Sequence, residues 1–248
     1  MKPQGYPETS GQGAWAAFLP SQAMDAILAY ITQPAHAALA GRLAATLNGQ
    51  LFDEVPDEII ETIGSHDGGW SEIDLTALEN AEHTRPASFI STSSAIAVHA
   101  WRRSINEAET KSPLSAYVVR SHFCLLAPRD EDVEHLFFRK EEEARLQRAK
   151  ADLKEGVDDL ENFVALLGFC DLLSLHLCSG WHSDFGLPLA HPAHPCAKDA
   201  GSIAVSINEG VVHLNGTNIS RGASVYVNGW ERRHANSLQN QRHEWIFR

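Results

Sequence analysis

The stretch VDDLENFVALLGFCDLLSLHLC, residues 157–178, is the most informative part of the chain for the fold. It is long and mostly apolar, which is typical of a helix buried in the core of a helical domain. Its apolar stripe consists of Leu160, Val164, Leu167 and Leu175. Asp171 falls on the same stripe. A buried neutral polar group without a partner costs roughly 2–7 kcal/mol and a charge costs more, so we expect Asp171 to have a compensating partner.

The segments before this helix predict further helices, because prolines and cap residues open them and glycines close them. The expected helices cover residues 22–31, 34–48, 56–68, 94–106, 113–126 and 129–152. A polar loop is expected between Gly69 and residue 93. The segment 129–152 is dense in charge, as in EEEARLQRAK, and is expected to be a solvated helix.

The character of the sequence changes after residue 180. Residues 181–200 contain three prolines and are expected to form a loop. Short β-rich runs then follow at 203–207, 211–214, 224–227 and 244–247. Turn signals such as Asn215-Gly216 separate them. These runs predict a small antiparallel β meander.

The expected fold is therefore mainly α, with a small C-terminal antiparallel meander. Residues 1–13 are rich in Gly, Pro and polar residues and predict a flexible tail. Residues 14–180 are expected to form the helical domain. Residues 181–248 are expected to pack on that domain, or to offer a partner surface or a homodimer contact.

The composition limits the classes of partner and compartment. The chain has 248 residues and 44% of them are hydrophobic, which is enough for a real core. A formal net charge of −12 disfavours extended nucleic acid as a partner. Four cysteines without a CxxC pair fit free thiols in a reducing compartment. With no apolar signal segment at the start and no apolar run of ~18–20 residues, we expect a cytoplasmic protein that does not span a membrane.

Polar residues interrupt the apolar stripes of four predicted helices. His36 lies on the stripe of Leu39 and Leu43, and the adjacent pair His66-Asp67 continues a stripe that contains Ile63. His122 falls on the stripe of 113–126, as Asp171 does on that of 157–178. One such histidine alone is usually a satisfied core residue. Three histidines and two aspartates on the inward faces of separate helices are a ligand set for a divalent transition metal, and Mn, Fe, Ni and Zn all remain candidates.

The order His36, then His66-Asp67, then Asp171 resembles the H…HD…D signature of the HD-domain superfamily of metal-dependent phosphohydrolases. More narrowly, four stretches resemble the family called domain of unknown function 3891 (DUF3891). These are QPAHAALAGRLA (33–44), SHDGGW (65–70), AYVVRSHFCLLA (116–127) and FCDLLSLHLC (169–178). The superfamily resemblance implies a helical bundle with the cation at its centre, and His36, His66, Asp67 and Asp171 as its ligands.

The same resemblance implies a role for His122, as a ligand to a second metal or as a contact to a substrate phosphate. A full two-metal set would need further histidines, for which His99 and His176 are candidates. Asp67, with one oxygen free of the metal, is expected to orient or deprotonate a water. The resulting functional hypothesis is a phosphohydrolase acting on a small phosphorylated molecule or nucleotide. A di-iron oxygenase and a non-enzymatic ligand-binding module are the alternatives.

Other residues are weaker candidates for the site. Arg120 is expected to neutralise a substrate phosphate, and Arg42 is a second candidate, although a surface arginine is the plainer interpretation of both. Trp70 is expected to line the pocket or stack on a base, with core packing as the alternative. His191-x-x-His194-x-Cys196, with His182 upstream, has some spacing of a zinc site. Its prolines and the lack of a clear fourth ligand argue against one.

Overall fold

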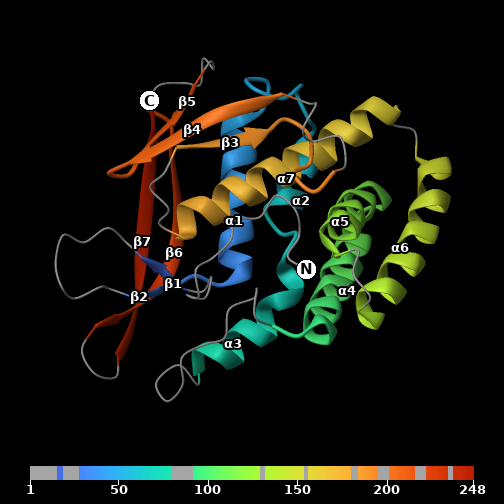
Figure 1. Cartoon of the computed structure of the whole chain (residues 1–248), viewed down its shortest axis with the longest axis horizontal. Helices are drawn as coiled ribbons and strands as arrows, with labels where there is room; N and C mark the ends of the chain where they lie inside the picture. The colour runs from blue at the N-terminus through green and yellow to red at the C-terminus, as the bar shows by residue number, and fades with distance from the viewer. Residues whose placement is uncertain are drawn as a thin grey trace.

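The protein is an α/β fold in which a seven-stranded mixed sheet faces a layered group of helices (Figure 1). The structure, a computed structural model, describes residues 16–18, 28–79, 92–128, 132–153, 156–179, 184–194, 201–215, 222–233 and 237–248. The predicted tail at 1–13 lies outside these residues. Within them, sequence segments from both ends of the chain contribute to the one sheet.

Two of the helices begin at a side-chain cap followed by a proline. α1 (Gln33–Leu47) begins after Thr32, whose hydroxyl accepts a hydrogen bond from the amide of Ala35, and Pro34 occupies its first turn. α5 (Pro113–Leu126) repeats this arrangement, with the Ser112 hydroxyl accepting from the amide of Ser115. The others are α2 (Asp57–Ile63), the short 3-10 helix η1 (Gly68–Trp70), α3 (Ser71–Glu79), α4 (Ser94–Lys111), α6 (Val133–Asp152) and α7 (Val157–Ser179).

The sheet is built from strands that are far apart in the sequence. They are β1 (Ala16–Phe18), β2 (Leu28–Tyr30), β3 (Phe185–Pro188), β4 (Ser202–Asn208), β5 (Val211–Leu214), β6 (Ser224–Arg233) and β7 (Ser237–Phe247). Their order in the sheet is β1-β2-β6-β7-β5-β4-β3. All neighbours are antiparallel except β5 and β7, which pair in parallel with Val211 opposite Ile246.

The prediction of a mainly α fold with a small antiparallel meander is wrong. The helix predicted to reach Ile31 is replaced at Leu28–Tyr30 by β2, which pairs with β6. The expected loop at 181–200 contains β3. β6 and β7 are 10 and 11 residues long, because polar residues continue the alternation of buried Val225 and Val227, and of buried Trp245 and Phe247. The parallel pairing of β5 with β7 excludes a simple meander.

The main core lies between the sheet and the helices α1 and α7. α1 and α7 pack against each other, and α1 also packs on β6. The same hydrophobic cluster contains Leu39 and Leu43 of α1, Leu173 of α7, and Val212 and Val227 of the sheet. Figure 1 shows α4, α5 and α6 on the side of α7 and α1 that faces away from the long strands β6 and β7. α1, α7 and the sheet therefore share one core.

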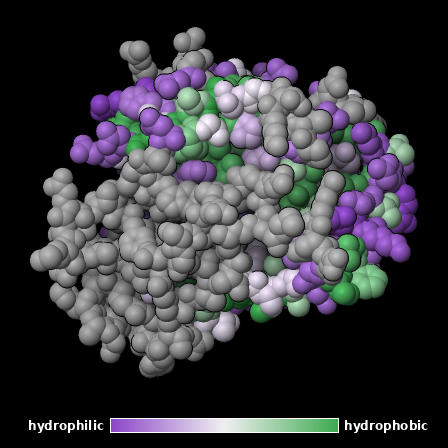
Figure 2. Space-filling model, viewed as in Figure 1, coloured by the Kyte–Doolittle hydropathy of each residue, from purple (hydrophilic) through white to green (hydrophobic). Residues whose placement is uncertain are grey.

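The apolar helix α7 is buried in the protein, whereas the charged helix α6 is mostly exposed to solvent. Within α7, Asp159–Cys178 is long and apolar enough to cross a membrane by composition, but 89% of that window is buried inside the protein. α6 buries only Phe138 and Glu142 fully, which confirms the predicted solvated helix. Figure 2 shows mainly hydrophilic residues along the right edge of the molecule, where α6 lies in Figure 1.

Candidate metal centre

Four buried side chains meet at one point in the helical layer. They are His36 of α1, His66 and Asp67 of the turn between α2 and η1, and Asp171 of α7. Each offers one ligand atom, and these atoms all lie within 4.8 Å of one another. Their exposed fractions are between 1% and 6%. The structure thus brings together the four residues that the sequence placed on three apolar stripes.

Two glycine contacts allow these segments to approach so closely. A Cβ on Gly41 of α1 would lie 2.6 Å from the Cα of Gly64, which follows α2. This backbone contact brings the middle of α1 close to the turn that carries His66. On the other side, a Cβ on Gly69 would lie 2.1 Å from the carbonyl oxygen of Ala100 in α4. The GGW sequence after Asp67 therefore fits the turn tightly against α4.

The ring of His36 is held from both nitrogens. Its Nε2 lies 2.8 Å from Oδ1 of Asp171, and its Nδ1 lies 2.6 Å from the hydroxyl oxygen of Ser174. The Ser174 hydroxyl donates its proton to the carbonyl oxygen of Asp171 at 2.8 Å. Ser174 therefore accepts a hydrogen bond from Nδ1–H of His36. This tautomer directs Nε2 of His36 toward the carboxylates.

His66 presents its Nε2 in the same way. Its Nδ1–H donates to the carbonyl oxygen of Ile63 at 2.8 Å. Its Nε2 lies 3.4 Å from Oδ2 of Asp67 and 3.4 Å from Oδ1 of Asp171. Within the described residues, this buried atom makes no hydrogen bond. A buried imidazole nitrogen aimed at two carboxylates and held in a fixed tautomer has the arrangement of a metal ligand.

The electrostatics of the cluster favour added positive charge. Burial would raise the pKa of Asp171, but the hydrogen bond from His36 and the nearby imidazole of His66 outweigh burial and hold that pKa well below its usual range. Burial raises the pKa of Asp67, against the opposing effect of the two histidines and of a hydrogen bond from the Trp70 side chain. Burial would lower the pKa of His66, but Asp67 and Asp171 raise it to about 9.

The donor set fits a divalent transition metal. Two imidazole nitrogens and two carboxylates suit borderline cations such as Mn, Fe, Ni and Zn, and they do not select one of them. Such a cation would supply the positive charge that the two buried carboxylates attract. It would also give Nε2 of His66 the partner that no described residue provides.

His122 lies beside this cluster and outside the four-atom group. Its Nε2 is 3.8 Å from Oδ2 of Asp171, and its Nδ1 is 2.8 Å from Nε2 of His191. The two histidines considered for a second metal are also elsewhere. His99 is exposed, and His176 stacks on Phe185 and hydrogen-bonds the carbonyl of Leu172. In the described part of the chain, no second group of three or more such ligands gathers this closely.

Arg120 and Trp70 have partners other than those expected from the sequence. Arg120 is buried and pairs with Glu142 at 2.7 Å and with Glu109. Its charge is therefore already matched by two carboxylates, which does not suit the predicted contact to a substrate phosphate. Trp70 is only 3% exposed and packs beside Ala97 and Ala100. It offers no open face for stacking, and acts on the cluster through its hydrogen bond to Asp67.

Arg42 is directed toward the sheet. It donates to the carbonyl oxygen of Tyr226 at 3.2 Å and lies over the Tyr226 ring. Two histidines considered for a zinc site near residue 191 have different surroundings. His191 is buried against His122, whereas His194 is exposed. His182 and Cys196 lie outside the described residues.

Sequence reasoning missed three neighbours of the cluster. Ser174 follows Asp171 by three residues in a helix that is otherwise apolar there, so its position on the same face was a usable signal. Asp74 is buried under the start of α1, where its Oδ2 accepts from the amide of Gln33. His191 comes from a proline-rich loop with no periodicity, and nothing in the sequence pattern places it at the helices.

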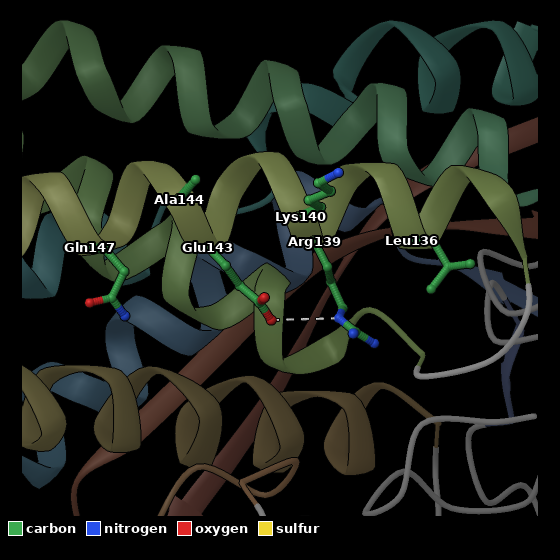
Figure 3. A pocket seen from close by; sticks show the side chains of 6 residues that line it. All are labelled: Leu136, Arg139, Lys140, Glu143, Ala144 and Gln147. Carbon is green, nitrogen blue, oxygen red and sulfur yellow. Dashed lines mark ion pairs between the residues drawn. The ribbon is translucent and has the colours of Figure 1, made fainter.

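One groove of the described surface is separate from the cluster. It runs along α6 and is lined by Leu136, Arg139, Lys140, Glu143, Ala144 and Gln147 (Figure 3). Arg139 and Glu143 form an ion pair across it. None of its lining residues belongs to the candidate metal centre.

Comparisons with known proteins identify a family and no characterised relative. No curated protein and no solved structure matches the chain. The sequence profile of one family, described as "Protein of unknown function (DUF3891)", matches residues 19–215. This match covers most of the chain and includes all four residues of the candidate metal centre. The chain therefore belongs to the DUF3891 family.

Proposed function

We propose that this protein is a metal-dependent phosphohydrolase that acts on a small phosphorylated molecule, nucleotides included, through an HD-type site. His36, His66, Asp67 and Asp171 would hold the metal. The observation that carries the proposal is the convergence of these four ligand atoms within 4.8 Å, all buried. The local hydrogen bonds to Ser174 and Ile63 already direct the two imidazoles.

The reaction class rests on the site and not on the surrounding fold. The order of the ligands along the chain resembles that of HD-domain phosphohydrolases, whereas the protein around them is an α/β fold. The net charge of −12 disfavours polymeric nucleic acid as the substrate and leaves small phosphorylated compounds.

The chain's own residues have distinct roles in this proposal. When bound, a divalent cation would lower the pKa of a water and polarise a phosphoryl oxygen. Asp67 would orient or deprotonate that water through a carboxylate oxygen that is free of the metal. Trp70 would hold Asp67 in place through its hydrogen bond. Ser174 would keep Nε2 of His36 directed at the centre.

The alternatives differ in what they require of the same residues. A di-iron oxygenase requires more ligands than the four that gather here, and His99 and His176 lie away from them. A non-enzymatic module would use the histidines and aspartates as a buried ion-pair network, without metal. Metal content separates this module from both enzymes.

The first experiment is elemental analysis of protein purified without chelator and without a histidine tag. We expect a stoichiometric transition metal in the wild type, its loss in Asp67→Ala, and its retention in the control Asp74→Asn, which alters a buried carboxyl outside the cluster. The loaded protein should then release phosphate from a panel of small phosphorylated compounds. If no metal binds even after reconstitution with Mn, Fe, Ni or Zn, the proposal fails. Bound metal without phosphate release from any compound would remove the hydrolase assignment.

A further inference from the structure

His122 and His191 form a buried pair at the edge of the candidate metal centre. Nδ1 of His122 lies 2.8 Å from Nε2 of His191, and both side chains are almost completely buried. Nε2 of His122 faces Oδ2 of Asp171 at 3.8 Å, which is too long for a hydrogen bond. Within the described residues, this atom has no hydrogen-bond partner.

The backbone fixes the direction of the hydrogen bonds in this pair. The amide of Ala193 donates to Nδ1 of His191 at 3.2 Å. A backbone N–H can only donate, so Nδ1 of His191 carries no proton and the proton of its ring is on Nε2. That proton is donated to Nδ1 of His122, which must be the acceptor. A neutral His122 then carries its own proton on Nε2, the atom that faces the centre.

The reverse arrangement is unfavourable. If Nε2 of His122 were a metal ligand, its Nδ1–H would donate to His191. The proton of His191 would then be on Nδ1, facing the Ala193 N–H at 3.2 Å, and two donors would meet in a buried place. A doubly protonated His122 is unfavourable for the same reason, because its Nδ1–H would face the Nε2–H of His191 at 2.8 Å.

Gly168 provides the space for this arrangement. It lies on α7, three residues before Asp171, and a Cβ there would lie 2.5 Å from Cδ2 of His191 and 2.7 Å from Cδ of Pro192. Only a glycine therefore lets the loop containing His191 and Pro192 pack against this turn of α7. The position of His191 beside His122 is thus built into the packing of the two elements.

We propose that His191 is a positioning residue that keeps His122 as a hydrogen-bond donor toward the centre, and prevents it from coordinating a metal. The inference rests on the proposed metal site. It makes the centre mononuclear, with His36, His66, Asp67 and Asp171 as its protein ligands. It also assigns the ligand chemistry on the His122 side of the centre: an anionic oxygen, as in a phosphoryl group, accepts the Nε2–H of His122.

The tautomers can be measured directly by nitrogen NMR on protein labelled with ¹⁵N-histidine, before and after loading with diamagnetic zinc. We expect His122 to carry its proton on Nε2 in both states, while Nε2 of His36 and His66 changes to a metal-bound signal. A zinc-bound signal at Nε2 of His122, or a proton on its Nδ1, would overturn the inference. The metal-free spectrum reports on the tautomers of His122 and His191 even if no metal binds. A failure of the proposed function can therefore be distinguished from a failure of this inference.

Two variants at position 191 test the positioning role. His191→Gln keeps a side-chain donor and should preserve the His122 tautomer, whereas His191→Leu should give a mixture of tautomers. In the zinc-loaded protein, we expect His191→Leu to weaken binding of inorganic phosphate by about tenfold or more, as for a lost hydrogen bond to a charged group, and Gln to restore it. Equal phosphate affinity and an unchanged His122 spectrum in His191→Leu would contradict the role.

Gly168→Ala provides a second test that changes no polar group. Its Cβ should displace His191 and reproduce the mixed tautomers and the weaker phosphate binding of His191→Leu. If the Gly168→Ala protein keeps both the wild-type His122 spectrum and the wild-type phosphate affinity, the packing at Gly168 does not determine the tautomer of His122.

Discussion

At the scale of single residues, Ser174 is the clearest example of a side chain that acts through a neighbour. Its hydroxyl joins the Asp171 carbonyl to Nδ1 of His36. We expect Ser174→Ala to lower metal affinity by about 10–100-fold, because an unsupported His36 ring loses its fixed tautomer and orientation. The measurement is competition for the metal with a chelator of known affinity. Ser115→Ala is the matched control, since Ser115 is a buried helical serine that bonds to Thr62, away from the cluster. Equal affinities in Ser174→Ala and the wild type would exclude this role.

Asp74 gives a second prediction at this scale, in the pH dependence of stability. Burial raises its pKa to about 8 in the folded protein, against a value near 3.8 without the fold. Between these values the native state holds a proton that the unfolded state has lost. The free energy of unfolding should therefore fall as pH rises, by ~1.4 kcal/mol per pH unit from this group, and level off above about pH 8.

The variant Asp74→Asn isolates this effect. An asparagine keeps an oxygen to accept from the amide of Gln33 but has no proton to lose. The stability of Asp74→Asn relative to the wild type should increase from pH 5 to pH 8 and stay constant beyond it. Denaturant unfolding at several pH values, with chelator present, measures the difference. A difference that does not change with pH would mean that Asp74 is ionised in the folded protein near neutral pH.

At the scale of elements, the approach of α1 to α2 sets the distance between His36 and His66. We expect Gly41→Ala to destabilise the protein by roughly 1–3 kcal/mol, because its Cβ would meet backbone atoms that cannot rotate away. Metal affinity should fall as well. Gly64→Ala is the matched control, since its Cβ would meet no atom closer than 3.5 Å. Thermal unfolding and metal titration of the two variants test this. Similar losses in both would contradict the packing argument.

The elements also show where sequence reasoning succeeds and fails. α1, α5 and α7 were predicted to within a few residues, because Pro34 and Pro113 mark first turns and the apolar stripes are continuous. α3 was missed, since among its residues only Asp74 is fully buried and Leu75 is 58% exposed, so it has no apolar stripe. β2 was missed because it is only three residues long and its place in the sheet depends on β6, which lies about two hundred residues later in the sequence.

The same distinction applies to the site. Inward-facing polar residues on helices could be found from periodicity, which is why His36, His66, Asp67 and Asp171 were predicted together. Their partners could not, because the His191 loop and the ion pairs of Arg120 depend on tertiary packing. A separation of two residues on a helix does not place Arg120 on the face of His122, and Arg120 pairs instead with Glu142.

At the scale of the whole molecule, the candidate ligands come from three segments, which are α1, α7 and the turn that follows α2. Two of these segments, α1 and α7, share the core with the sheet. A metal that binds only the native arrangement must therefore stabilise the entire fold. At a free concentration one hundred times the dissociation constant, the gain is about 2.7 kcal/mol. For a chain of this size, that corresponds to a rise in melting temperature of roughly 5–10 °C. Thermal unfolding with and without chelator measures it, and Asp67→Ala should show little or no shift. An equal shift in the variant would mean that the metal binds elsewhere. A shift in neither protein would mean that the four residues bind no metal and that their mutual ion pairs alone hold this part of the core together.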